Sequence, residues 1–179
     1  LGLPEDKKLL LFGAVSPYQD RRKGGSYLLE ALQLFKDITQ TNLVTFGSNK
    51  ELEKVNSLKN HNLGYVSSDE KMALIYSSCD VFIAPAIEEN LANTVLEAMA
   101  CGTVVVAFNV GGMSDAIDHK VNGYLAEPNN VLDLKNGIDW ALKNSDKVNI
   151  LAREKIENKF SQKIAIQRYR KLYLDVLDK

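Results

Sequence analysis

Short apolar runs alternate with amphipathic stretches along most of the chain. The runs are rich in β-branched and large apolar residues, which is typical of buried strands, whereas the stretches between them repeat apolar residues every three or four positions, as helices do. Strands that alternate with helices build a parallel sheet whose two faces are covered by helices. We therefore predict an α/β fold: a doubly wound, mostly parallel, six-stranded Rossmann-like sheet with helices on both faces and a helical C-terminal tail.

The same pattern gives approximate boundaries. The expected strands cover residues 9–15, 43–46, 61–66, 80–84, 104–108 and 123–126. The expected helices cover residues 26–38, 51–58, a stretch that begins at Ser68, and residues 93–100, 114–117, 131–142, 147–159 and 161–177. The last of these carries more apolar residues than one packing face needs, so we expect part of its apolar surface to be exposed.

Charge and cysteine content exclude several classes of function. Lys and Arg number 22 and Asp and Glu number 23, so the net charge of −1 provides no overall field for nucleic acid or an anionic membrane. An anionic ligand would therefore have to be bound by groups placed locally around it, not attracted by the overall charge. Cys79 and Cys101 have no partner at metal-binding spacing, and we expect both to be buried thiols in a reducing, intracellular protein. No apolar run is long enough to span a bilayer.

Two glutamates follow the fourth expected strand. Glu89 lies in the loop after that strand, and Glu97 lies in the helix that comes next. In open parallel sheets, ligands bind outside the carboxyl ends of the strands, next to helix N-termini. Two carboxylates there can hold a polyol at two points. The spacing leaves two alternatives open, because Thr94 and Glu97 also match a capping box and Glu89 also fits a solvated acid beside Glu88.

A basic turn follows the first expected strand, in the sequence Arg21-Arg22-Lys23-Gly24-Gly25. Its position is equivalent to that of the glutamates, and clustered cations suit a phosphate group; the alternative is an exposed basic turn. The first strand does not lead into GxGxxG, and GxxxxGK[ST] is absent, so dinucleotide-binding and P-loop fingerprints are missing. Gly111-Gly112 forms a third loop, after the fifth expected strand. These glycines would let the backbone approach a ligand closely, and the alternative is an ordinary flexible turn.

Taken together, these segments resemble a known family. The stretch EENLANTVLEAMACGTVVVAFNVGG, residues 88–112, resembles the signature of the retaining glycosyltransferases of family 4, also called group 1: a Glu, seven residues, then Glu-Ala-Met-Ala-x-Gly, a Val-rich strand and a Gly-Gly loop. Further landmarks occur in the family's order and extend the resemblance over nearly the whole chain: Phe12-Gly13, Arg22-Lys23-Gly24, Leu29-Glu30-Ala31-Leu32, Gly64-Tyr65-Val66, Tyr76 to Asp80, Asn122-Gly123 and Phe160-Ser161.

The resemblance implies a GT-B enzyme with two Rossmann-like domains. Residues 1–179 would form the C-terminal, nucleotide-sugar-binding domain, residues 1–7 would be a linker, and an N-terminal acceptor domain would be missing. The implied reaction is retaining glycosyl transfer from a UDP-, GDP- or ADP-sugar to an acceptor glycan or lipid-linked glycan, in polysaccharide or glycoconjugate biosynthesis. No cofactor, metal or nucleic acid is implied, and the isolated domain would bind the donor without turnover. The enzyme would be cytoplasmic, with any membrane association through the missing domain.

Two alternatives to glycosyl transfer remain open: a GT-B-type nucleotide-sugar epimerase and a non-catalytic nucleotide-sugar-binding module.

The resemblance also implies roles for single residues. Glu89 would contact the transferred sugar near the reacting centre, Lys23 would bind the diphosphate, and Glu97 would bind the ribose hydroxyls. The substrate-binding set would be completed by Arg22, by the backbone of Gly64, Tyr65 and Val66 at the base, and by Asn90, Leu91, Ala92, Asn93 and Thr94 at the phosphates.

Two positions depart from the family pattern. Many members have Phe-Gly where this chain has Leu91-Ala92, and Ala92 lacks the freedom of glycine at positive φ. Many members carry an Arg where this chain has Ala14, so Arg22 or Arg21 would have to supply that phosphate contact.

Overall fold

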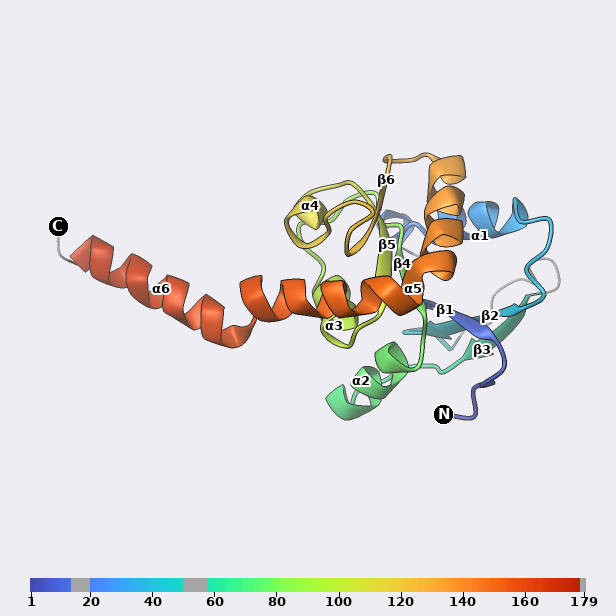
Figure 1. Cartoon of the computed structure of the whole chain (residues 1–179), viewed down its shortest axis with the longest axis horizontal. Coiled ribbons are helices and arrows are strands. Elements are labelled where there is room, and N and C mark those ends of the chain that lie inside the picture. Colours follow the sequence, from blue (N-terminus) through green and yellow to red (C-terminus); the bar gives the residue numbers. More distant parts are fainter. Residues whose placement is uncertain (14–19, 50–57, 178–179) are drawn as a thin grey trace.

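The strands form one parallel sheet, in agreement with the predicted fold (Figure 1). The computed structural model describes residues 1–13, 20–49 and 58–177. The strand order is β3-β2-β1-β4-β5-β6, and every strand pair is parallel. The strands are β1 (Lys8–Gly13), β2 (Thr41–Phe46), β3 (Lys59–Asn62), β4 (Val81–Ala84), β5 (Val104–Phe108) and β6 (Gly123–Ala126).

The order of the strands determines where a ligand can enter. The chain builds outward from β1 through β2 to β3, and then returns to pair β4 with the other side of β1. In doubly wound sheets, this reversal opens a crevice at the edge where the strands end. We call that edge the carboxyl edge and the opposite one the amino edge.

Helices cover both faces of the sheet because successive strand residues point to opposite sides. The helical segments are η1 (Arg21–Lys23), α1 (Gly25–Gln33), α2 (Asp69–Ser77), α3 (Asn93–Ala100), α4 (Met113–Ala116), α5 (Val131–Lys159) and α6 (Gln162–Leu177). Alternate strand residues such as Leu10 and Val104 pack with α1 and the first half of α5, while Leu11 and Val105 pack with α2, α3, α4 and the second half of α5.

The two helices predicted at residues 131–142 and 147–159 are one continuous helix, α5, which bends part way along its length (Figure 1). The polar residues between them favoured a break. In the structure Ser145 is buried, and the Lys8 ammonium donates to Ser145 Oγ at 3.3 Å and to Asp146 Oδ1 at 3.2 Å. The bend thus carries α5 from one face of the sheet to the other.

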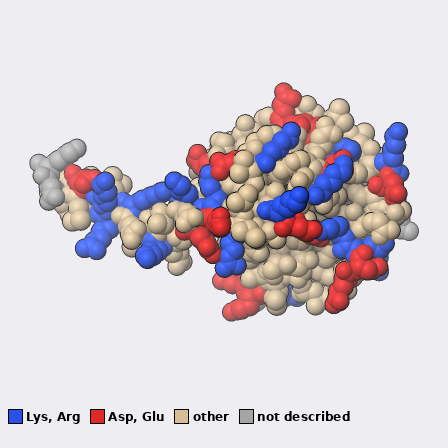
Figure 2. Space-filling view, in the orientation of Figure 1, with Lys and Arg blue, Asp and Glu red and all other residues tan. Residues whose placement is uncertain are grey.

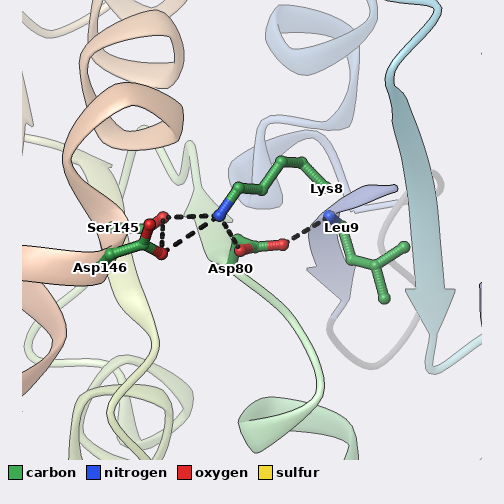
Figure 3. A network of polar contacts seen from close by, with 5 residues as sticks. All are labelled: Lys8, Leu9, Asp80, Ser145 and Asp146. Atoms are coloured by element: carbon green, nitrogen blue, oxygen red, sulfur yellow. Dashed lines mark hydrogen bonds and ion pairs between the residues drawn. The ribbon is translucent and has the colours of Figure 1, made fainter. Parts of the chain in front are cut away.

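Asp80 anchors this bend to the amino edge (Figure 3). Its Oδ1 accepts from the Lys8 ammonium at 2.7 Å, and its Oδ2 accepts from the backbone N–H of Leu9 at 2.8 Å. The hydrogen bond with Asp80 raises the pKa of Lys8. One aspartate therefore connects the starts of β1 and β4 and, through Lys8, the middle of α5.

Several boundaries differ from prediction. β3 begins and ends earlier than residues 61–66, because it is an edge strand, pairs only with β2, and needs no apolar run. α1 stops at Gln33, although Ile38 beyond it is still buried. The helix expected at residues 51–58 falls almost wholly outside the described residues, as does the end of the strand expected at 9–15.

Helix α6 extends away from the rest of the molecule, and none of its residues is buried (Figure 1). The expectation that it exposes apolar surface is confirmed. Basic side chains lie beside this surface (Figure 2). Its exposed apolar residues are Ile166, Tyr169, Leu172, Tyr173, Leu174, Val176 and Leu177. Across residues 1–13, 20–49 and 58–177, no helix has the length and apolar character needed to cross a membrane.

Candidate functional site

The turn after β1 packs against the loop after β4 at the carboxyl edge. Asp20 caps the short helix η1 by accepting from Arg22 N–H at 3.0 Å, and Gly24 ends it with φ of 71°. A Cβ on Gly24 would lie 1.7 Å from the carbonyl oxygen of Pro85, so only glycine fits there. Ile87 N–H also donates to the Arg22 carbonyl at 2.9 Å. The two loops are held together through their backbones.

This packing brings Lys23 and Glu89 together. The Lys23 ammonium lies 2.9 Å from Glu89 Oε2, and the two side chains are 31% and 21% exposed. The other carboxylate oxygen, Oε1, accepts from Asn90 N–H at 3.2 Å. A cation and a carboxylate thus share a partly buried position between β1 and β4, where the crevice of the fold opens.

The glycine pair after β5 supports this loop from its other side. Gly111 has φ of 54°, and a Cβ on it would lie 1.9 Å from the carbonyl oxygen of Glu89. Gly112 N–H donates to the Asn90 carbonyl. The close backbone approach expected of these glycines is therefore made to the chain's own loop, which it helps to hold in place.

Arg22 is engaged within its own turn. Its guanidinium binds Asp20 through two hydrogen bonds of 3.0 and 2.8 Å, and its side chain is 64% exposed. These hydrogen bonds lower the pKa of Asp20, and Asp20 together with the nearby charges of Glu88 and Glu89 raises the pKa of Arg22. Arg22 therefore adds positive charge near the Lys23–Glu89 pair, while its guanidinium makes its hydrogen bonds to Asp20. Ala14, where many family members carry an Arg, lies outside the described residues.

The N-terminus of α3 opens next to Glu89. Its N-cap residue is Ala92, and no side chain caps the helix. The first backbone N–H groups of a helix lack intrahelical acceptors and carry partial positive charge, which favours an anion. Ala92 has φ of −69°, a conformation open to any L-residue, so the replacement of glycine here causes no backbone strain.

The capping-box alternative for Glu97 is wrong. The helix begins at Asn93, so Thr94 is already inside it, and the Glu97 carboxylate does not return to the Thr94 amide. Instead, Glu97 Oε2 accepts from the Tyr76 hydroxyl at 3.1 Å. Burial, and then the charge of Glu97, raises the pKa of Tyr76. In the sequence, Tyr76 stands out only as the start of a family landmark, which gives no sign of this partner.

The Gly64-Tyr65-Val66 loop lies farther along the same edge, after β3. Gly64 has φ of 66°, and its carbonyl accepts from Gly47 N–H, after β2, at 2.8 Å. Tyr65 is 63% exposed. Three strand spacings separate β3 from β4, a distance of about 14 Å. The loop is therefore at the same edge as Glu89 but is not in contact with it.

The candidate residues thus lie along the carboxyl edge of the sheet. A hollow of about 850 Å³ lies at the amino edge, lined by residues 1–9 with Gln40, Leu74, Ser78 and Asp80, and it contains none of the candidate residues. Within the described part of the chain, no cluster of three or more His, Cys, Asp or Glu side chains is placed to hold a metal ion. Both Cys79 and Cys101 are free thiols.

The chain is similar to known proteins of one family. The family model described as "Glycosyl transferases group 1" matches residues 1–159. The chain is 30% identical over 156 residues to the N,N'-diacetylbacillosaminyl-diphospho-undecaprenol alpha-1,3-N-acetylgalactosaminyltransferase of Campylobacter jejuni, with 84% of this chain and 41% of that protein covered.

Two solved structures share the fold. Sucrose-phosphate synthase from Thermosynechococcus elongatus superposes with a TM-score of 0.83 at 25% identity, over 98% of this chain and 47% of the other. Anabaena HepE, solved in complex with UDP and glucose, superposes with a TM-score of 0.76 at 20% identity, over 94% of this chain and 48% of the other. The chain spans 37–48% of the lengths of the first curated relatives it matches.

Proposed function

This chain belongs to the group 1 glycosyl transferases, and from that premise we propose that its carboxyl edge binds the nucleotide-sugar donor of a retaining, family 4 type of glycosyl transfer. The observation that carries the proposal is the Lys23–Glu89 pair of 2.9 Å beside the uncapped N-terminus of α3. A cation, a carboxylate and a row of helix amides at one point match the diphosphate and sugar parts of such a donor.

Each part of the donor has a proposed partner. Lys23 and the backbone N–H groups of residues 91–94 bind the diphosphate, with Asn90 beside them, and no metal is required. Glu89 contacts the sugar near the bond that breaks. Glu97, one turn into α3, accepts from the ribose hydroxyls. Arg22 contributes positive charge without direct contact.

The base binds at the Gly64-Tyr65-Val66 loop through backbone groups. The separation of about 14 Å between the ends of β3 and β4 supports this assignment, because an extended nucleoside diphosphate must lie across several strand ends. The exposed Tyr65 ring is available to contact a base. Anabaena HepE and its bound UDP provide a related example of the fold with such a nucleotide.

We propose a front-face reaction. The bond between the anomeric carbon and the diphosphate oxygen breaks, the sugar becomes oxocarbenium-like, and the acceptor hydroxyl attacks from the same face. The leaving phosphate takes the proton of that hydroxyl. Because negative charge develops on the phosphate, Lys23 and the α3 amides stabilise the transition state more than the ground state.

The acceptor site is proposed to lie in an N-terminal domain of a longer GT-B enzyme, with residues 1–7 as the linker. Two observations support this: the chain spans less than half the length of the first relatives, and α6 exposes an unpaired apolar surface. The Campylobacter relative is named for a lipid-linked diphosphate acceptor, which supports a role in polysaccharide or glycoconjugate synthesis. The chain alone is expected to bind a donor without transferring its sugar.

Thermal unfolding in the presence of UDP-, GDP- and ADP-sugars tests this proposal. A donor that binds the folded state stabilises it by RT ln(1 + [L]/Kd), so Tm should rise with the logarithm of donor concentration once that concentration exceeds Kd. One nucleotide class should raise the Tm of this chain, and the sugar-free diphosphate of the same base should also do so. A Tm unchanged by all three classes at millimolar concentration would contradict donor binding.

A further inference from the structure

The Tyr76 hydroxyl is a buried polar group held in a fixed place. Tyr76 is 1% exposed, and its ring makes edge-to-face contacts with Phe46 and Phe82 at centroid distances of 6.2 and 5.7 Å. Its backbone is also held, because the buried Thr103 hydroxyl donates to the Tyr76 carbonyl at 2.7 Å. Neither the ring nor the backbone can move without disturbing the core that lies between β2 and β5.

Glu97 is an exposed side chain on the surface of α3. A free glutamate at such a position samples several rotamers, and ordering it on ligand binding costs conformational entropy. Here Oε2 accepts from the Tyr76 hydroxyl at 3.1 Å, so the carboxylate is attached to a group that cannot move. Burial keeps Tyr76 protonated by raising its pKa, so it remains a donor at every physiological pH.

We propose that Tyr76 is a positioning residue for donor binding: its buried hydroxyl orients the Glu97 carboxylate toward the ribose hydroxyls, and thereby sets both nucleotide affinity and the preference for ribonucleotides over 2′-deoxyribonucleotides. This inference rests on the proposed function of Glu97. It adds a residue from α2, behind the site, that does not touch the ligand.

The test measures the affinity of this chain for UDP, GDP and ADP and for their 2′-deoxy counterparts by calorimetry. Tyr76→Phe keeps the ring and its contacts with Phe46 and Phe82 and removes only the hydroxyl. Tyr124→Phe is a matched control, because Tyr124 is also buried and donates to a carboxylate, Asp133 Oδ1, at 2.7 Å, but far from the proposed ribose site.

For the nucleotide that binds wild type, Tyr76→Phe should weaken affinity about 5- to 10-fold, the effect of losing one oriented, charge-assisted hydrogen bond. The ratio of ribo to deoxyribo affinity should fall as well, which a purely structural role of the hydroxyl would not produce. Tyr124→Phe should change neither quantity. Combined with Glu97→Ala, which removes the acceptor of the Tyr76 hydroxyl, Tyr76→Phe should cause no further loss, because the two residues act through one contact.

Two results would overturn the inference while leaving the proposed function standing: wild-type affinity and ribose preference in Tyr76→Phe, or additive losses in the double variant. If wild type binds none of the three diphosphates, the proposed function itself fails and the role of Tyr76 fails with it. The wild-type titration alone therefore tells a failure of the proposed function from a failure of the inference about Tyr76.

Discussion

Lys23 and Glu89 are 66 positions apart in the sequence, and their side chains form an ion pair of 2.9 Å across the ends of β1 and β4. The pair lies where the strand order of the sheet reverses. Because an ammonium has three donors, Lys23 can keep Glu89 as a partner and still face a phosphate oxygen. The same contact therefore orients a carboxylate for the sugar and a cation for the leaving group.

Lys23→Ala in the full-length enzyme should lower kcat by roughly 10²-fold, since it removes a group that stabilises charge developing on the leaving diphosphate. Steady-state rates with the matching donor and acceptor provide the measurement. Lys143→Ala is the control, because Lys143 also pairs with a carboxylate, Asp139 at 3.1 Å, but on the exposed side of α5. Equal rates for Lys23→Ala and wild type would argue strongly against the assigned role.

Glu89→Gln should reduce transfer far more than donor binding. The substitution preserves the size of the side chain but removes the charge beside the reacting sugar, so we expect kcat to fall by about 10²-fold with little change in KM. The neighbouring Glu88 is exposed, and Glu88→Gln should behave like wild type. A higher KM at unchanged kcat in Glu89→Gln would assign the residue to ground-state binding instead.

Gly111→Ala should destabilise the chain by about 3 kcal/mol or more, because a methyl group would meet the backbone oxygen of Glu89 at 1.9 Å in a backbone conformation with φ of 54°. Gly102→Ala isolates the conformational part of this cost: φ is 79° there, but the nearest atom lies at 3.9 Å, so about 1–2 kcal/mol is expected. Urea unfolding measures both. Similar losses in the free energy of unfolding for the two variants would contradict this expectation, because they would mean that the loop at Glu89 shifts to accommodate the methyl group at little cost.

Cys79 should resist alkylation in the folded chain. Burial raises the pKa of its thiol to about 12, and because the thiolate is the nucleophile, little of it is present at pH 8.5. Its reaction should accelerate as pH rises toward that value. Cys101 is less buried and should react first with iodoacetamide, while both should react alike in urea. Mass spectrometry of the modified peptides provides the measurement, and faster labelling of Cys79 in the folded protein would contradict its burial.

The fold was predictable because its buried strands and helices leave clear local patterns. β5, covered on both faces, is a continuous apolar run and was predicted to the residue, as were α3 and β6. The edge strand β3 lacks such a run and was misplaced. The continuity of α5 was not predictable either, because Lys8, which satisfies the polar Ser145, lies 137 positions away.

The candidate site was predictable in part, for a similar reason. Strand alternation placed Lys23 and Glu89 at the same edge, but their contact depends on β1 and β4 being neighbours, which local patterns do not specify. Glu97 matched a capping box through its spacing from Thr94, whereas its actual partner, the Tyr76 hydroxyl, comes from another helix and could not be read from that spacing. Sequence spacing describes contacts within one element, whereas the site is built from contacts between elements.

Calorimetric titration of this chain with UDP, GDP and ADP, in wild type and in Glu97→Gln, tests the central claim most directly. If the carboxyl edge holds the donor through the ribose and the diphosphate, wild type should bind one of these nucleotides, and Glu97→Gln should bind it roughly tenfold more weakly because a charge-assisted hydrogen bond is lost. Absence of binding to wild type, or equal affinity in the two proteins, would contradict the account.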